Sequence, residues 1–444
     1  MASAAEQLAA NLNFSAFGKA EELKKRLWFT LGALLIYRLG TYIPLPGLDV
    51  AMLKEIAAQQ SKGILGMFDA LAGGAFGRKA IFALNIMPYI SASIIVQLLT
   101  TVSPQLAALK KEGEAGRKAI NQYTRYGTVL LATVLGFAIA ISLMNSDTHV
   151  VQNPGVFFLI TATATLVGGT VFLMWLGEQI TARGVGNGIS LIIFAGIVAG
   201  IPKGLIQLLE QGRQGTISIA LIVVFIIAAI LVVGVVVFME RAQRRLLVQY
   251  PKRQVGNKVM QGDSSHLPLK LNSAGVIPPI FASSLLLVPI TIAQFMGTGG
   301  PEWLTYVVSA LGQGAPLHIL FYVSLIVFFA FFYTAVVFNP QETADNLKKY
   351  GGFIPGIRPG PRTAEYIDYV LTRITVVGAG YLAVICVLPE IVSTQTPIKF
   401  YFGGTSLLIV VSVTMDTVAQ IQSHLLAHQY EGLIKKAKLR GARR

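Results

Sequence analysis

The sequence predicts an all-α polytopic membrane protein with ten transmembrane helices. Of its 444 residues, 54% are hydrophobic and 13% are charged, whereas a soluble domain carries about 25% charged residues. Ten segments have the length and apolar character of a spanning helix, which needs about 20 mainly apolar residues. Lys and Arg gather in alternate loops between these segments, as the loops of a multi-pass protein do.

The ten predicted spans run along almost the whole chain. They are residues 26–45, 78–102, 122–144, 154–177, 187–206, 216–239, 273–296, 317–338, 370–390 and 401–424. The second, fifth, seventh and tenth segments carry several polar residues and have the weakest apolar pattern. Residues 1–25 are polar or amphipathic and predict a cytoplasmic N-terminal segment lying along the membrane surface.

The distribution of basic residues orients the spans. Of the 36 Lys and Arg residues, 28 fall on the side that holds both termini and 7 fall on the other. Basic loops stay in the cytoplasm, so both termini are predicted to be cytoplasmic and the number of spans even. Arg38 lies inside the first span, where we expect its side chain to snorkel outward.

Ten spans divide into two halves of five. The predicted N-terminal half is 26–206 and the C-terminal half is 207–424, followed by a basic cytoplasmic tail at 425–444. Because five is odd, two similar halves would have opposite orientations, the inverted arrangement common in transporters.

Two cytoplasmic loops, 240–272 and 339–369, are longer than topology requires, and long ordered loops are often functional. In the second loop, Gly and Pro surround Arg358 in the stretch PGIRPG. Such turn residues hold a loop in one shape, which suits docking to a partner. Scattered basic charge in the loops is otherwise explained by topology alone.

Residues 66–90, GMFDALAGGAFGRKAIFALNIMPYI, read as a short apolar half-helix, a break at Gly73-Gly74 and a span that carries Asn85 and Pro88. We interpret the first part as re-entrant, since irregular backbone at membrane depth is tolerated where it lines a cavity. Pro88 is expected to remove one backbone bond and bend the span.

Isoleucine pairs recur at i, i+4 spacing, which places both members of a pair on one helix face. Ile86 and Ile90 form one pair, and Ile189 and Ile193 form another. Ordinary helix packing explains such pairs, and so does an apolar constriction that seals a pore by excluding water. The spacing alone leaves both open.

Two other classes of membrane protein fit part of the pattern. A secondary transporter for a small solute would share the inverted halves, but the spans show no relay of buried ionisable groups that an ion-coupled pump needs. An intramembrane hydrolase would need a motif such as H-E-x-x-H or G-x-S-x-G, and neither occurs. The single cysteine, Cys386, reads as a small packing residue.

Several long segments together resemble one family. They are AIFALNIMPYISASIIVQLL (80–99), FLMWLGEQITARGVGNGISLIIFAGIVAG (172–200), HLPLKLNSAGVIPPIFASS (266–284), VFNPQETADNLKK (337–349), GGFIPGIRPG (351–360) and FYFGGTSLLIVV (400–411). In this order they are similar to the bacterial SecY family, the channel-forming subunits of the protein translocase. The resemblance implies ten helices in two inverted five-helix halves around a central hourglass pore. It implies no enzymatic activity and no cofactor.

The resemblance also implies four groups of functional residues. A pore ring would consist of Ile86, Ile90, Ile189, Ile193, Ile280 and Ile409. A plug at 63–76 would include Met67, Phe68, Asp69, Leu71, Gly73 and Gly74. A lateral gate would be formed by Ser91, Ser93, Gln97, Phe281, Ser283 and Ser284. Docking to SecA or the ribosome would use Arg358, Lys252 and Arg253.

The implied function is a passive, gated channel in the bacterial plasma (inner) membrane. It would carry unfolded secretory polypeptides across and release membrane-protein helices laterally into lipid. The chain has no P-loop motif, so the implied drive comes from the SecA motor ATPase or the translating ribosome. The small subunits SecE and SecG, signal sequences, nascent polypeptides and membrane lipids are the other implied partners.

Two positions depart from the family pattern. Members commonly have Gly immediately before the first pore isoleucine, where this chain has Asn85, whose amide is expected to bond the plug backbone or water. The stretch GNKVM (256–260) has one basic residue where relatives often have two, which weakens a docking role for Asn257.

Overall fold

The computed structural model describes most of the chain. The described residues are 21–49, 69, 72–144, 150–251, 253–255, 258–260, 264–296, 303, 306, 307, 310, 312, 315–395 and 404–441. The predicted surface segment lies almost entirely outside this part, as does most of the predicted plug. The chain divides into two compact units: unit 1 consists of residues 1–97, 108–205 and 409–444, and unit 2 consists of 98–107 and 206–408.

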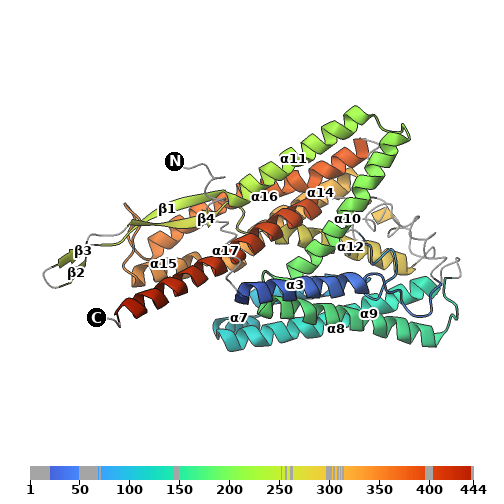
Figure 1. Ribbon diagram of the computed structural model, residues 1–444, viewed down its shortest axis with the longest axis horizontal. Coiled ribbons are helices and arrows are strands. Elements are labelled where there is room, and N and C mark those ends of the chain that lie inside the picture. Colours follow the sequence, from blue (N-terminus) through green and yellow to red (C-terminus); the bar gives the residue numbers. More distant parts are fainter. Residues whose placement is uncertain are drawn as a thin grey trace. The chain divides into compact units, whose positions relative to one another are not determined.

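Unit 1 is helical. Its elements are α3 (Glu21–Gly40), most of α6 (Met87–Val102), the end of α7 (Pro104–Lys111), α8 (Glu114–Met144), α9 (Val156–Arg183), most of α10 (Gly188–Arg213) and all but the start of α17 (Gly404–Gly441). Helices α8 and α9 lie side by side, and α3 also packs on α9 (Figure 1). Small residues on α8, among them Ala132, Gly136 and Ala140, are buried there and let the two backbones approach closely, as at many membrane helix interfaces.

Unit 2 combines helices with a β-ribbon. Its elements are α11 (Ile219–Arg241), β1 (Gln243–Gln249), β2 (Arg253–Val255), β3 (Lys258–Met260), β4 (Ser264–Lys270), α12 (Ile277–Met296), α14 (Pro316–Val337), α15 (Pro340–Lys349) and α16 (Pro361–Gln395). Helix α14 packs against both α12 and α16, and α15 packs on α16. Asn339 caps α15, because its side-chain Oδ1 accepts from the backbone N–H of Gln341 at 3.1 Å.

The strands form two antiparallel pairs within the predicted loop 240–272. β1 pairs with β4, from Gln243 opposite Lys270 to Gln249 opposite Ser264. β2 pairs with β3 farther out, so this short pair forms the tip (Figure 1). We did not predict these strands, because QRRLLVQ is mostly polar and lacks the regular apolar–polar alternation that indicates a half-buried strand.

Each of the ten predicted spans corresponds to one helix: α3, α6, α8, α9, α10, α11, α12, α14, α16 and α17. Among the described residues, seven helices are long and apolar enough to cross a membrane, and α6 with α7 forms an eighth candidate bent by 103°. α3 and α12 fall outside that count. Helix α11 exposes large apolar side chains such as Val224, Ile227 and Leu231, which fits lipid rather than water. The chain is therefore a multi-pass membrane protein.

The second span starts later than predicted. We expected a helix from residue 78, but turns continue to residue 86 and α6 begins at Met87. Asn85 has a φ of 50°, a left-handed conformation that ends any helix before it. Pro88 is the second residue of α6, where a missing N–H costs nothing. The Ile90 N–H still donates to the Ile86 carbonyl at 3.1 Å, so the expectation that Pro88 removes a backbone bond between Ile86 and Ile90 was wrong.

Candidate pore seal and plug

The break at Gly73-Gly74 is held by two arginines. Arg38 at the end of α3 donates from Nη1 to the Gly73 carbonyl at 2.8 Å, and Arg78 donates from Nη2 to the same oxygen at 2.9 Å. Arg78 Nε also donates to the Thr41 carbonyl at 3.0 Å. The expectation that Arg38 snorkels outward was therefore wrong, because its guanidinium has a backbone acceptor close by.

Asp69 closes the turn around this break. Its carbonyl accepts from the Gly74 N–H at 2.7 Å, and its carboxylate Oδ1 accepts from the Gly77 N–H at 2.6 Å. A charged acceptor makes the second bond the stronger kind. Of the predicted plug residues, Asp69, Gly73 and Gly74 are described, whereas Met67, Phe68 and Leu71 lie outside the described residues.

Gly73 also lies directly against α10. A Cβ built on Gly73 would be 2.9 Å from the Gly196 Cα and 3.1 Å from Arg38 Nη1. Gly73 has a φ of 64°, which L-residues with a side chain seldom adopt. Two glycine backbones thus bring the break into contact with the helix that carries Ile189 and Ile193.

Lys79 is a buried cation in the turns before α6. It is 4% exposed, and its Nζ lies 4.1 Å from the centroid of the Phe76 ring. Burial lowers the pKa of the Lys79 ammonium to about 8, and the Asp69 carboxylate opposes this shift. Lys79 also has a φ of 49°. Burial of Lys79 therefore lowers the free energy of unfolding, and favourable packing in the surrounding turns has to offset this loss.

The structure gives a reason for Asn85 at the position where the resemblance led us to expect Gly. Asn is the residue other than Gly that most readily adopts a left-handed conformation, and Asn85 has one. Its side chain lies near the hydroxyl of Tyr37, which donates to the Ala72 carbonyl at 3.4 Å. Tyr37 thus connects α3 to the plug backbone at Ala72, and the bond expected from the Asn85 amide to the plug backbone or water stays a prediction.

The six predicted ring isoleucines occupy equivalent places in their helices. Ile86 immediately precedes α6 and Ile90 is in its first turn, and the other four also lie within the first two turns of α10, α12 or α17. Ile86, Ile90, Ile193 and Ile409 are 1–8% exposed. Ile189 and Ile280 are partly buried. Five of the six belong to unit 1, and Ile280 belongs to unit 2.

A tight turn between α9 and α10 positions Ile189 and Ile193. A Cβ on Gly188 would overlap the carbonyl oxygen of Gly177, so these two positions need glycine to let the helices meet. The Gly188 N–H donates to Thr181 Oγ1 at 2.9 Å, and Thr181 Oγ1 in turn donates to the Gly177 carbonyl at 2.9 Å. Asn187 caps α10 by accepting the Ile189 N–H at 3.1 Å.

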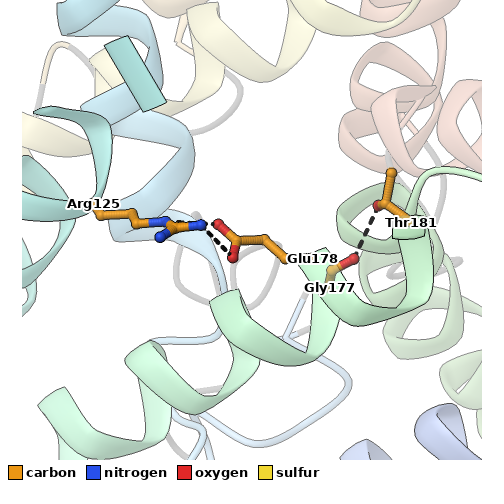
Figure 2. A network of polar contacts seen from close by, with 4 residues as sticks. All are labelled: Arg125, Gly177, Glu178 and Thr181. Carbon is orange, nitrogen blue, oxygen red and sulfur yellow. Dashed lines mark hydrogen bonds and ion pairs between the residues drawn. The ribbon is translucent and has the colours of Figure 1, made fainter. Parts of the chain in front are cut away.

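An ion pair next to this turn joins α8 to α9. Arg125 donates from Nε and Nη2 to the two carboxylate oxygens of Glu178 at 3.0 and 2.8 Å (Figure 2). Figure 2 also shows the Thr181–Gly177 bond one turn farther along α9. The bidentate geometry fixes the relative rotation of the two helices, although partial exposure keeps its contribution to stability small.

The predicted gate residues lie on α6 and α12. Gln97 Nε2 donates to Ser93 Oγ at 3.4 Å, and Ser91 is partly buried on the same helix. On α12, Ser283 and Ser284 donate to the Ile280 carbonyl at 3.0 and 2.8 Å. Phe281 is buried and packs edge-on against Phe329 and Tyr333 of α14. These two sets belong to different units.

The structure joins the two predicted docking loops. Gln249 at the end of β1 exchanges two backbone hydrogen bonds with Phe353, of 2.9 and 3.0 Å. Leu246 and Leu269 of the hairpin share a buried apolar cluster with Ile354 and Ile367 of the second loop.

Arg358 is exposed, and its carbonyl accepts the Thr363 hydroxyl at 2.8 Å. This bond fixes the turn that holds Arg358. Arg253 begins β2 at the tip of the hairpin, and Lys252 lies outside the described residues.

Sequence reasoning missed a buried polar group in unit 2. His318 Nδ1 lies 2.8 Å from Glu390 Oε1, and both side chains are 8% exposed. Tyr322, one turn after His318, stacks on its ring and shares a 2.7 Å hydrogen bond with Thr405. His318 lies at the beginning of the predicted span 317–338 and Glu390 ends the predicted span 370–390. Both are visible in the sequence as ionisable residues at span ends, but the sequence does not indicate that these two ends meet.

Comparison with solved structures defines the class of protein. The chain resembles "The structure of a protein conducting channel", with a TM-score of 0.66 at 19% identity over 90% of this chain and 92% of that one. A channel structure that addresses its plug domain gives 0.65 at 19% identity, again over 90% and 92%. Sec61 in the canine ribosome-channel complex gives 0.64 at 18% identity over 90% and 92%. The fold is that of protein-conducting channels.

Comparison of sequences identifies the family. The SecY family model matches residues 80–418. The protein translocase subunit SecY of Vibrio cholerae serotype O1 is 56% identical over 431 residues, 96% of this chain and 97% of that protein. The subunit of Escherichia coli K12 is 55% identical over 430 residues, with the same two coverages. The chain belongs to the SecY family, the channel-forming subunits of the protein translocase.

Proposed function

We propose that this protein forms the pore of a bacterial Sec translocase in the plasma (inner) membrane, with both termini in the cytoplasm. The channel is passive and carries unfolded polypeptide. Family membership supports this function, and the excess of basic residues in alternate loops supports the orientation. The observation that carries the pore assignment is the shared place of six isoleucines at the beginnings of four helices.

These isoleucines form the seal. Apolar side chains make no fixed polar contacts, so polypeptides of any sequence slide past them, and an apolar constriction excludes water and ions when empty. The glycine-rich turn between α9 and α10 supports the role of Ile189 and Ile193, because it holds the first turns of α10 in one place.

The plug, residues 63–76, closes the channel and includes the break at Gly73-Gly74. The contacts of Gly73 with Arg38 of α3 and with Gly196 of α10 support a docked, closed position, and Asp69 stabilises the turn around Gly73-Gly74. Ser91, Ser93 and Gln97 on α6, with Phe281, Ser283 and Ser284 on α12, form the lateral gate that releases signal sequences and membrane-protein helices into lipid. The Ser283 and Ser284 hydroxyls donate within α12 itself, so these two hydroxyls stay hydrogen-bonded when the gate opens.

Arg358, Lys252 and Arg253 dock the cytoplasmic partner that drives transport, SecA or the ribosome. Basic side chains bind ribosomal RNA phosphates in a salt-dependent way. The joined loops support this role, since the Gln249–Phe353 pairing makes one surface from two segments. The relative named for a ribosome-channel complex supports the ribosome as partner. SecE and SecG complete the membrane complex.

The decisive experiment asks whether the ring meets the translocating chain. The buried Cys386 is first replaced by Ser, and cysteine is then introduced as Ile193→Cys or, as a matched control, Ile160→Cys, whose isoleucine is 61% exposed on α9. We expect Ile193→Cys to crosslink to a stalled secretory polypeptide and Ile160→Cys not to do so. Crosslinking at the control position alone would reject the pore assignment.

A second experiment tests the plug. Deletion of residues 66–72 should raise the ion leak of the reconstituted channel or admit substrates with defective signal sequences. An unchanged leak and unchanged selectivity would contradict the role of the plug.

A further inference from the structure

Two guanidinium groups share one backbone acceptor at the plug. The Gly73 carbonyl oxygen accepts from Arg38 at 2.8 Å and from Arg78 at 2.9 Å. Gly73 lies in the predicted plug, whereas Arg38 belongs to α3 and Arg78 to the turns that follow the plug. Hydrogen bonds from a charged donor are stronger than those from neutral donors. One oxygen of the plug is thus the target of two strong donors.

Both arginines are held in place by groups outside the plug. Arg38 Nη2 donates to the Tyr42 hydroxyl at 2.8 Å, and Arg78 Nε donates to the Thr41 carbonyl at 3.0 Å. The Tyr42 ring also lies 4.9 Å from the Arg38 guanidinium carbon and 4.4 Å from that of Arg78, within the range of cation–π attraction. The donors are therefore preorganised, and binding the plug costs little further side-chain entropy.

We propose that Arg38 and Arg78, which we call the arginine clasp, are positioning residues that hold the plug in its closed position through the Gly73 carbonyl. This inference rests on the proposed role of the plug. Movement of Gly73 away from α3 breaks both bonds together, while the contacts of the arginines with Thr41 and Tyr42 persist. The clasp therefore favours the closed state and leaves α3 itself intact when the channel opens.

The clasp is tested by the chloride leak of the purified translocase complex in proteoliposomes, without a translocating substrate. We expect Arg38→Gln and Arg78→Gln each to raise the leak about tenfold, the effect of losing one charge-assisted bond from the closed state. Arg213→Gln is the matched control, because Arg213 is an exposed arginine at the end of α10. The control should leak like the unmodified protein.

A conservative variant separates charge from geometry. Arg38→Lys keeps the positive charge but has no planar fork to bridge the Gly73 carbonyl and the Tyr42 hydroxyl. We expect it to leak more than the unmodified protein. If the Arg38→Gln protein fails to assemble, the leak of the Arg38→Lys protein tests the clasp in its place. A leak equal to that of the unmodified protein would overturn the proposed geometry.

The deletion of 66–72 distinguishes failure of the clasp from failure of the plug. In that background the clasp has no plug to hold, so Arg38→Gln and Arg78→Gln should add no further leak. Equal increases with and without the plug would overturn the clasp, because they would indicate a general loss of packing. If the deletion raises the leak but neither arginine variant does, the clasp alone is wrong. If the deletion leaves the leak unchanged, the plug assignment fails and the clasp fails with it.

Discussion

Gly73 and Gly196 approach each other so closely that a Cβ on Gly73 would lie 2.9 Å from the Gly196 Cα. This contact joins the break in the plug to the helix that carries Ile189 and Ile193. Real Cβ atoms do not come this near to a backbone carbon, and a backbone atom of a packed helix cannot move aside as a side-chain tip can. The closed position of the plug therefore depends on glycine at residue 73.

Gly73→Ala should weaken the closed state. The new methyl group meets the α10 backbone and has to adopt a φ of 64°, at a cost of about 1–3 kcal/mol. We expect the chloride leak of the reconstituted channel to rise, with transport of an ordinary secretory substrate retained. Gly32→Ala is the control, because a Cβ there has open space. A leak equal in both variants would contradict the importance of this contact.

Gly188→Ala should disturb the turn that places Ile189 and Ile193. The added Cβ would overlap the Gly177 carbonyl oxygen, so α9 and α10 would have to separate and the Gly188–Thr181 bond would be lost. Overpacking of this kind costs about 1–3 kcal/mol. We expect a lower thermal unfolding midpoint of the purified complex and a higher ion leak. Gly168→Ala on α9, where the new methyl has open space, should change neither quantity.

Lys79 gives stability a pH dependence with a definite sign. Burial lowers its pKa to about 8, from an ordinary value of 10.5, so between these values the unfolded protein binds more protons than the folded protein. Stability from this residue therefore rises with pH across that window, and below about pH 8 the full penalty for the buried charge applies.

Lys79→Met should remove this pH dependence. It should stabilise the protein at pH 7 by up to about 3 kcal/mol, and the advantage should shrink as the pH approaches 10. Thermal unfolding of both proteins at pH 7, 8.5 and 10 measures this difference. A constant difference across the three values would contradict the role of burial.

The sequence was sufficient for the helices and for their order, because long apolar segments have few alternatives in a membrane. It was not sufficient for the start of the second span. An apolar stretch from residue 80 reads as helix, and the left-handed backbone at Asn85 is visible only in the structure. The same φ explains how Asn is accommodated at a position where the resemblance led us to expect Gly.

The candidate site was predictable in its residue types and not in its contacts. The Gly73-Gly74 break and the isoleucine pairs are visible as spacing. The bonds from Arg38 to Gly73 and from His318 to Glu390 join residues 35 and 72 positions apart. A hydropathy pattern identifies spans, but it does not indicate which distant residues contact each other. A charged residue near a span end was therefore interpreted as snorkelling, although the structure gives it a backbone partner.

The partners of the buried pair His318–Glu390 should be coupled more strongly than those of the partly exposed pair Arg125–Glu178. The first lies 2.8 Å apart with both side chains 8% exposed, and the second has the same distance with side chains 50% and 31% exposed. Removing one partner of a buried pair costs about 3–5 kcal/mol, whereas exposed pairs contribute about 0–1 kcal/mol.

Two double-mutant cycles measure this difference. His318→Leu, Glu390→Leu and the double variant form the first cycle, and Arg125→Leu, Glu178→Leu and their double variant form the control cycle. We expect each single change in the buried pair to lower the unfolding midpoint strongly, and the double change to recover much of the loss because neither buried polar side chain then remains without the other. The control cycle should show a coupling below about 1 kcal/mol. Equal couplings in the two cycles would mean that burial does not strengthen the His318–Glu390 contact.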